Sequence, residues 1–314
     1  MNQFQNRLHK FSKFTAIATF FLLCAGALVT STGSGLAVPD WPLSFGKFFP
    51  PMIGGVVFEH GHRMIAGAVG ICAMILCLWI WMKEQRRWVR VLALASVLVV
   101  VAQAILGGLT VRFLLPDAIS ISHAGLAEVF FCLMVSLAVF TSQKWLKSNV
   151  SFSNTETVSE VSYLEKSVSL RFLATMMTSV IYVQILLGAY FRHADTGVSM
   201  HVSWALMVAF FVGWMSSRIL RNPAYPGFLV KMVLFEFALL IVQFILGPSA
   251  LVAKLVYPSL VKQDVVKVLF TAGHLAVGAL MLATSLMITL WCFKMTQRFT
   301  ERHFVVAMSQ ETAG

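Results

Sequence analysis

The chain has 314 residues, of which 58% are hydrophobic and only 12% are charged, and its net charge is +11. That charged fraction is about half of what soluble domains usually carry. Several apolar stretches approach or exceed the roughly 20 residues that span the hydrocarbon as a helix, whereas the short alternating segments of a membrane β-barrel are absent. The composition therefore excludes a soluble domain and predicts an all-α membrane protein.

The positive charge does not indicate a nucleic-acid partner. In a soluble protein it would do so, but here the basic residues form short clusters between apolar stretches. Such clusters are typical of topogenic charge beside anionic lipid. The five cysteines all fall inside predicted spans, so we expect no disulfide framework.

Eight membrane spans are predicted in chain order. They cover residues 12–31, 62–82, 89–111, 121–142, 170–191, 199–220, 228–250 and 268–293. The first follows three basic residues, as a signal peptide would, but no clean cleavage site comes after it, and we expect a retained helix.

Lys and Arg set the expected orientation. Seventeen of the 24 lie in the two tails and in the loops 82–90, 143–171 and 218–231. Since basic residues accumulate on the cytoplasmic side, both termini are expected in the cytoplasm. Short loops and the absence of a transit-like leader favour a bacterial plasma membrane.

A repeated pattern divides the chain into halves. The polar stretch 147–169 separates residues 1–146 from residues 170–314, each with four spans. A Gln-x-x-Leu-Gly motif lies near the outer ends of spans three, five and seven, and a histidine begins the span that follows each copy. In span one, residues 26–30 lie at the position equivalent to these motifs. Close helix packing alone would explain the small residues of these motifs. Because a histidine follows each copy at the start of the next span, however, the pattern predicts two pseudo-repeated four-helix bundles. The three copies of the motif are 103–107, 184–188 and 243–247.

Histidines recur at the non-cytoplasmic starts of the even-numbered spans. Ionisable groups within spans are costly and are functional candidates. A single histidine there would more often be an interfacial hydrogen-bonding residue, but recurrence at four helix starts favours a common function. Because residues i and i+2 do not share a helix face, only one of His60 and His62 should be a ligand. The residues are His60, His62, His123, His201 and His274.

Haem is the favoured ligand of these histidines. Imidazole is a common axial ligand of haem iron, and helical bundles build cofactor sites from facing side chains. Four histidines at one depth allow two bis-histidine haems, one in each half. The small residues Ala66, Gly67, Gly125 and Gly278 are expected to leave room for the macrocycle. Zinc is the rival, but it would need carboxylate, thiolate or a tighter histidine cluster.

Glu59 is the other unusual residue. By helix spacing it shares a face with His62 and can reach Arg63. It is either a helix-start carboxylate that satisfies free amides, or a carboxylate beside a bound haem that takes protons during oxidation. Arg63, Arg112 and Arg192 lie near the outer boundary, where they could pair with haem propionates or extend to lipid phosphate.

Two stretches resemble the haem A synthase family. Residues 30–46, Thr-Ser-Thr-Gly-Ser-Gly-Leu-Ala-Val-Pro-Asp-Trp-Pro-Leu-Ser-Phe-Gly, are similar to that family's first external loop, and Glu59-x-x-His62-Arg63-x-x-x-Gly67 is similar to its second helix. The resemblance covers nearly the whole chain. It implies an enzyme that oxidises a methyl group of haem O to the formyl group of haem A, for use by terminal oxidases.

The resemblance also implies residue roles. His62 rather than His60 fills the ligand position, and Glu59 fills the essential carboxylate position. His62 and His123 would hold the substrate haem, while His201 and His274 would hold a resident haem b that passes electrons. A membrane electron acceptor, the farnesyltransferase that makes haem O and a second copy of the chain are possible partners. The cysteine pairs that some bacterial members carry in external loops do not occur here.

Ligation by two histidines leaves no open iron position. Oxygen could then bind only if His62 or His123 let go. Otherwise electrons leave the ring and water attacks the activated carbon, with Glu59 as the proton acceptor, which is the route that we favour.

Two other classes remain open at this point. The chain could be a di-haem b electron-transfer cytochrome without a haem substrate, although an electron carrier would need neither Glu59 beside His62 nor the external loop pattern. It could also be a transporter built from repeats, but the histidines are expected at the membrane edge and not at its midplane.

Overall fold

The computed structural model describes residues 3–147, 160–223, 225–256 and 265–311. Within these ranges, eight helices are long and apolar enough to cross a membrane, and no β-strand occurs. The predicted all-α class and the eight spans are therefore confirmed. The helices are α1 (Gln3–Ser31), α2 (Gly55–Lys83), α3 (Arg87–Arg112), α4 (Asp117–Phe140), the five-residue α5 (Gln143–Lys147), α6 (Glu160–Ala194), α7 (Val198–Leu220), α8 (Gly227–Val256) and α9 (Val265–Glu311).

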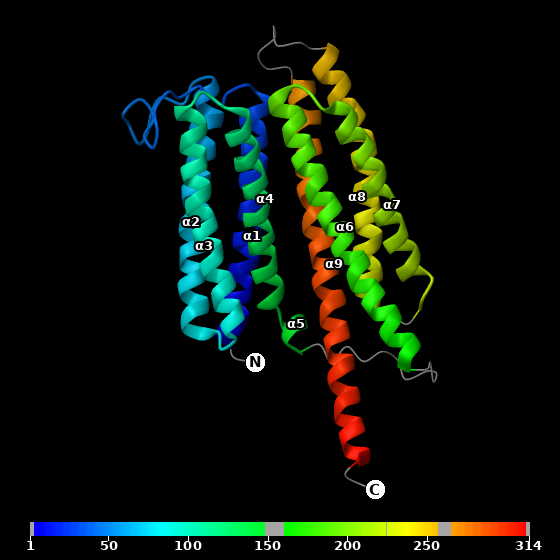
Figure 1. The fold of residues 1–314 in the computed structure, drawn as a ribbon. Helices are drawn as coiled ribbons and strands as arrows, with labels where there is room; N and C mark the ends of the chain where they lie inside the picture. The colour runs from blue at the N-terminus through cyan, green and yellow to red at the C-terminus, as the bar shows by residue number, and fades with distance from the viewer. Residues whose placement is uncertain (1–2, 148–159, 224, 257–264, 312–314) are drawn as a thin grey trace.

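The eight long helices stand in two groups of four, side by side (Figure 1). In one group α1, α2, α3 and α4 contact one another in a closed ring, and in the other α6, α7, α8 and α9 do the same. The groups meet where α1 and α4 pack against α6 and α9. The stretch 148–159 of the expected linker lies outside the described residues, and α6 begins at Glu160, well before its expected span.

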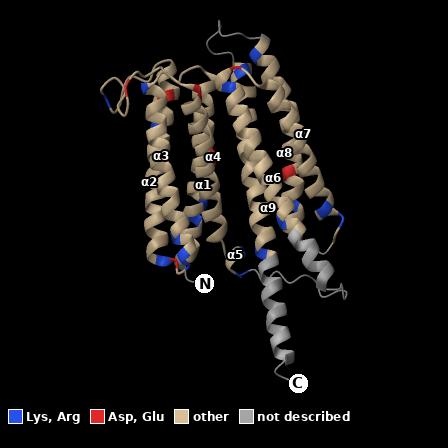
Figure 2. Ribbon diagram, viewed as in Figure 1, with Lys and Arg blue, Asp and Glu red and all other residues tan. Residues whose placement is uncertain are grey.

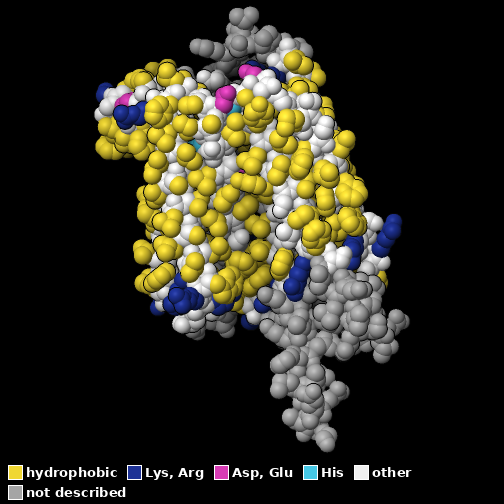
Figure 3. Space-filling view, viewed as in Figure 1, with side chains coloured by type: hydrophobic (Ala, Val, Ile, Leu, Met, Phe, Trp, Pro, Cys, Tyr) yellow, Lys and Arg dark blue, Asp and Glu magenta, His cyan; other side chains and the backbone are white. Residues whose placement is uncertain are grey.

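The helices pack through a mixture of apolar and small polar side chains. Lipid gives no hydrophobic driving force between helices, so close packing and interhelical hydrogen bonds hold them together. Thr289 illustrates this: its hydroxyl lies 2.9 Å from that of Thr178 and donates to the backbone oxygen of Ala174 at 2.9 Å, which joins α9 to α6. Hydrophobic side chains cover the outward flanks of the helices along the face shown in Figure 3.

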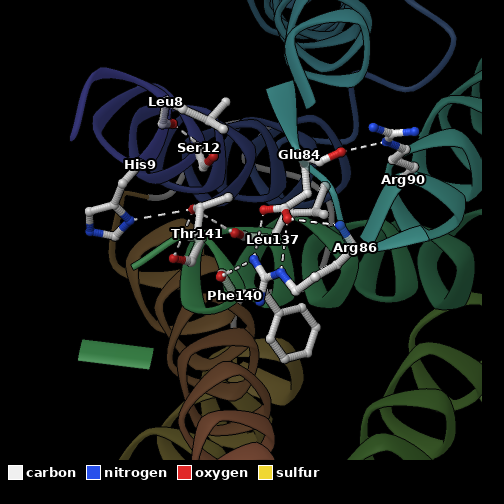
Figure 4. Close-up of polar contacts among 10 residues, drawn as sticks. Leu8, His9, Ser12, Glu84, Arg86, Arg90, Leu137, Phe140 and Thr141 are labelled. Atoms are coloured by element: carbon white, nitrogen blue, oxygen red, sulfur yellow. Dashed lines mark hydrogen bonds and ion pairs between the residues drawn. The ribbon is translucent and has the colours of Figure 1, made fainter. Parts of the chain in front are cut away.

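A polar network ties the first group together at the inner end, where α1 begins (Figure 4). Arg86, in the turn between α2 and α3, donates to the Glu84 carboxylate at 2.8 Å and to the backbone oxygen of Phe140 at 2.8 Å. Burial opposes ionisation of Glu84, but the hydrogen bonds from Arg86 outweigh it and lower the pKa of this carboxyl. Thr141 and His9 lie within 3.5 Å of each other, so α4 is also linked to α1.

The end of the first group that lies opposite the start of α1 carries the longest described loop. Residues 32–54 connect α1 to α2 and project sideways from the helix ends (Figure 1). Asp40 closes a turn within this loop, because its carboxylate accepts hydrogen bonds from the backbone of Phe45 at 2.6 Å and of Gly46 at 2.8 Å. The amide of Gly46 is the main cause that lowers the pKa of Asp40.

Lys and Arg occur at both ends of the described helices (Figure 2), so the orientation stays a prediction drawn from their number. In a chain whose five cysteines have been replaced, we expect Phe48→Cys, in the exposed loop between α1 and α2, to react with a membrane-impermeant maleimide in intact cells. Gln85→Cys, in the turn between α2 and α3, should react only after permeabilisation. The opposite labelling pattern would reverse the proposed orientation.

Candidate functional site

The four expected ligand histidines lie at one level of the structure. His62, His123, His201 and His274 each fall within the first three turns of their helices, which are α2, α4, α7 and α9. All four side chains are half-buried. Within each group the two histidine-bearing helices are diagonal to each other, because each contacts the other two helices of its ring. Facing helices of a bundle are where cofactor sites are built.

Each histidine packs against a glycine of the preceding helix. A β-carbon at any of these glycines would lie only 3.0–3.2 Å from Cε1 of the imidazole, closer than ordinary van der Waals contact. Glycine is therefore needed for the ring to fit between the helices. Three of these glycines are the last residue of a Gln-x-x-Leu-Gly motif. The fourth, Gly26, lies in the segment 26–30 of span one, which the sequence pattern predicted to be equivalent. The pairs are Gly26–His62, Gly107–His123, Gly188–His201 and Gly247–His274.

The glutamine of each motif binds the backbone of the same histidine. Its Nε2 donates to the histidine's carbonyl oxygen, which fixes the distance between the two helices at this level. We call this contact the glutamine clamp. The distances are 2.7 Å for Gln103–His123, 3.1 Å for Gln184–His201 and 2.9 Å for Gln243–His274.

Two of the expected small residues serve a different purpose. A β-carbon at Gly125 would meet Leu186, and one at Gly278 would lie 3.1 Å from Nε2 of Gln243. Neither glycine's nearest neighbour is a histidine ring. The reason is that helical side chains point back toward the helix N-terminus, so each imidazole lies above its own helical turn and against the preceding helix.

The two histidines of the second pair lie close to each other. The ring centres of His201 and His274 are 6.2 Å apart and the ring planes are inclined by 81°. Two imidazoles on opposite sides of a metal ion have ring centres roughly 6 Å apart, because each metal–nitrogen bond is about 2 Å long and each ring centre lies about 1 Å beyond its nitrogen. His62 and His123 are within electrostatic range of each other.

The imidazoles are oriented by the preceding helix. Nδ1 of each of the four histidines is buried, and the backbone oxygens of Leu22, Gln103 and Gln184 lie close to the rings of His62, His123 and His201. A carbonyl oxygen beside one nitrogen of an imidazole orients the ring so that the other nitrogen can bind a metal ion. The tighter cluster of three or more His, Cys, Asp or Glu side chains that zinc would require does not occur in the described ranges. The donor set fits haem ligation in pairs.

Glu59 joins α2 to the external loop. It is 4% exposed, and its Oε2 accepts a hydrogen bond from the backbone of Val38 at 2.8 Å. Arg63 donates from Nη2 to Oε1 of Glu59 at 2.5 Å, and from Nη1 to the backbone oxygens of Asp40 and Leu43 at 2.7 and 2.9 Å. The expected ion pair between Glu59 and Arg63 is present, and the same two side chains hold the loop over the start of α2.

His60 has a structural partner. Its Nδ1 lies 2.8 Å from the hydroxyl of Ser44 in the external loop, and both residues are buried. A ring committed to the loop faces away from the position of His62, as the helical spacing predicted.

Two buried carboxyl groups escaped the sequence analysis. Glu128 in α4 and Glu236 in α8 are 3% and 1% exposed. Oε2 of Glu128 and both carboxyl oxygens of Glu236 lack a hydrogen-bond partner in the described parts of the chain. Glu128 is within electrostatic range of Cys24 in α1 and of Tyr182 in α6, which places it where the two groups meet. An acidic residue inside an apolar run was the available signal.

Arg192 and Arg112 differ in their surroundings. Arg192 donates to the hydroxyl of Ser31 at 2.6 Å, and Thr271 donates to the same hydroxyl at 2.9 Å. These contacts tie α6 and α9 to the outer end of α1, and Arg192 is within electrostatic range of His274. Arg112 is exposed at the end of α3.

Comparison with known proteins bears on this arrangement. Residues 55–208 match the family described as cytochrome oxidase assembly protein, a range that contains Glu59, Arg63 and three of the four histidines. Three relatives carry the name "Heme A synthase". That of Bacillus licheniformis is 32% identical over 189 residues (59% of this chain, 58% of the relative), that of Alkalihalophilus pseudofirmus 28% over 193 (60% and 61%), and that of Bacillus pumilus 30% over 200 (62% and 62%).

The chain is similar to haem A synthases. The family resemblance predicted from the sequence is thus confirmed. The chain spans about three fifths of the length of the relatives that it matches.

The glycine–imidazole contact can be tested against a matched control. Gly188→Ala would place a β-carbon 3.0 Å from Cε1 of His201, whereas no described atom lies within 4 Å of a β-carbon at Gly213. We expect Gly188→Ala to destabilise the protein by about 1–3 kcal/mol through overpacking and Gly213→Ala to stabilise it by about 0.5–1 kcal/mol. Thermal unfolding in detergent measures both, and equal effects of the two substitutions would contradict the proposed steric role.

Proposed function

We propose that the chain is a haem A synthase that oxidises a methyl group of haem O to the formyl group of haem A. The observation that carries the proposal is an asymmetry between the two histidine pairs. Glu59 stands three residues before His62, whereas Ser120, Val198 and Thr271 hold the same position before the other three histidines. A carboxylate one helical turn from a ligand is needed by a proton-accepting reaction and not by electron transfer alone.

The two pairs would hold different haems. His62 and His123, in residues 1–146, would bind the substrate haem O. His201 and His274, in residues 170–314, would bind a resident haem b, and their ring separation of 6.2 Å supports this assignment. When bound, haem b supplies one-electron transfer. Arg63 acts electrostatically on His62 and Arg192 on His274, and each arginine could meet a propionate.

The chemistry requires protons and electrons to leave. Conversion of a methyl group to a formyl group with oxygen from water releases four protons and four electrons, and the electrons would pass to a membrane acceptor. This route needs no open position on the iron, in keeping with ligation by two histidines. Glu59 could take protons, because its oxygens keep lone pairs beyond those that accept hydrogen bonds from Val38 and Arg63.

A second candidate is a di-haem b electron-transfer cytochrome. The bonds from Val38 and Arg63 to Glu59 favour it, because they give the carboxylate a structural task that needs no reaction. In either case the protein would lie in a bacterial plasma membrane with both termini in the cytoplasm. The farnesyltransferase that makes haem O and a second copy of the chain are proposed partners of the enzyme.

Replacement of Glu59 separates the two candidates. After co-expression with a haem O source, we expect chromatography of the extracted haems to show haem A with the wild type and at least tenfold less with Glu59→Gln, because the amide cannot take a proton. The amide oxygen can still accept the hydrogen bond from Val38. The control is protease sensitivity of residues 32–54, which should stay unchanged. Full haem A formation by Glu59→Gln would contradict the proposed role of Glu59, whereas haem b alone in both proteins would favour the electron carrier.

Single histidine replacements test the assignment of the pairs. We expect His201→Ala and His274→Ala to lose most of the resident haem b, whereas His62→Ala and His123→Ala should keep it and lose haem O oxidation, because each haem depends on its own two ligands. Haem content and type per protein are the measurements. Loss of haem b from His62→Ala alone would mean that the pairs are assigned to the wrong haems.

A further inference from the structure

The four histidines share the glycine contact but not the glutamine clamp. The backbone oxygens of His123, His201 and His274 each accept a hydrogen bond from a glutamine of the preceding helix. At His62 the residue in the glutamine's position, four before the contacting glycine, is Leu22. The backbone oxygen of Leu22 lies close to the His62 imidazole, so the register is the same. A leucine side chain, however, has no donor.

The clamp glutamines are costly to bury. Oε1 of all three is buried without a hydrogen-bond partner among the described residues. An unpartnered amide oxygen costs free energy that an apolar side chain of similar size would not, and Leu22 shows that leucine fits. The Gln243 side chain crosses α9 at Gly278, where a β-carbon would come within 3.1 Å of it. These costs are offset if each clamp holds a histidine's backbone in place.

His62 is held in a different way. Its neighbours in α2 bind the external loop: Glu59 accepts from the backbone of Val38 at 2.8 Å, and His60 lies 2.8 Å from the Ser44 hydroxyl. The start of α2 is therefore anchored to a loop at the outer surface. Loops open at lower free energy than packed helices, so this anchor can yield without separating two helices.

We propose that His62 is the releasable ligand of the substrate haem and that the glutamine clamps keep the other three histidines on iron. This rests on the proposed function, since it concerns how haem O enters and haem A leaves. In the exchange the bond between iron and the His62 nitrogen would break first, and the bond to His123 would break when the haem departs; each electron pair would stay on its imidazole. His123, which is clamped by Gln103, keeps the haem in place until it departs. The pair His201 and His274, clamped on both sides, retains its haem b through every turnover.

Installing the missing clamp tests this directly. The full chain, co-expressed with a haem O source and purified in detergent, is mixed with excess apomyoglobin as haem acceptor, and the loss of each haem is followed by absorbance and by extraction. We expect Leu22→Gln to slow the loss of the first-site haem roughly two- to tenfold, the size of one hydrogen bond, and to lower its high-spin fraction. Loss of haem b should not change. Leu22→Met, which adds no donor, should behave like the wild type.

Removing a clamp gives the converse result and guards against misfolding of one variant. Gln184→Leu should speed the loss of haem b by a similar factor, and Gln103→Leu should speed the loss of the first-site haem. A rate of first-site loss that is unchanged in Leu22→Gln, or a loss of haem b that is unchanged in Gln184→Leu, would overturn the proposal. Formation of haem A is not a readout. If both sites carried haem b, the proposed function would fail, while the two rates of loss would still test the clamps.

Discussion

The contact between a glycine and an imidazole is the constraint on which the structure depends. It occurs four times, each time between a helix that ends at the outer surface and the helix that returns from it. A side chain on the glycine would push the two helices apart. A smaller residue in place of the histidine would leave no imidazole between the helices to bind iron. Because lipid does not drive helices together, close approach at glycine and the hydrogen bonds beside it set where each pair of helices meets. The diagonal placement of the histidines, and so the position of both candidate haems, follows from these four contacts.

The repeated contacts make the deviations informative. Three units have a glutamine beside the glycine, and one has Leu22. One unit has a carboxylate before its histidine, Glu59, and the others have Ser, Val or Thr. Both deviations fall on His62. The fold tolerates the buried carboxylate of Glu59 because Val38 in the loop and Arg63 in α2 both donate hydrogen bonds to it. A structural role and a chemical role for Glu59 are therefore compatible, since the bonds that fix the loop also fix the carboxylate near the ligand.

The contact region between the two groups of helices has its own polar chemistry. Ser31 joins α1 to Arg192 and Thr271, and the Tyr182 hydroxyl lies 3.3 Å from the backbone oxygen of Gly125, so α6 touches α4 as well. Glu128 is buried in the same region. The contacts of Ser31 and Tyr182 thus join the two groups of helices through hydrogen bonds.

The sequence by itself determined the class, the eight spans and the resemblance to haem A synthases, because hydrophobic length and residue type are local properties. It also determined that His60 and His62 point to different sides of α2, since helical spacing fixes the angle between them. It did not determine which small residues contact the imidazoles, a place that Gly26, Gly107, Gly188 and Gly247 have. Only the packing of one helix on another decides this, because an imidazole leans toward the N-terminus of its own helix and meets its neighbour there. The tertiary structure likewise decided that Glu59 bonds to Val38, 21 residues away, which no local pattern encodes.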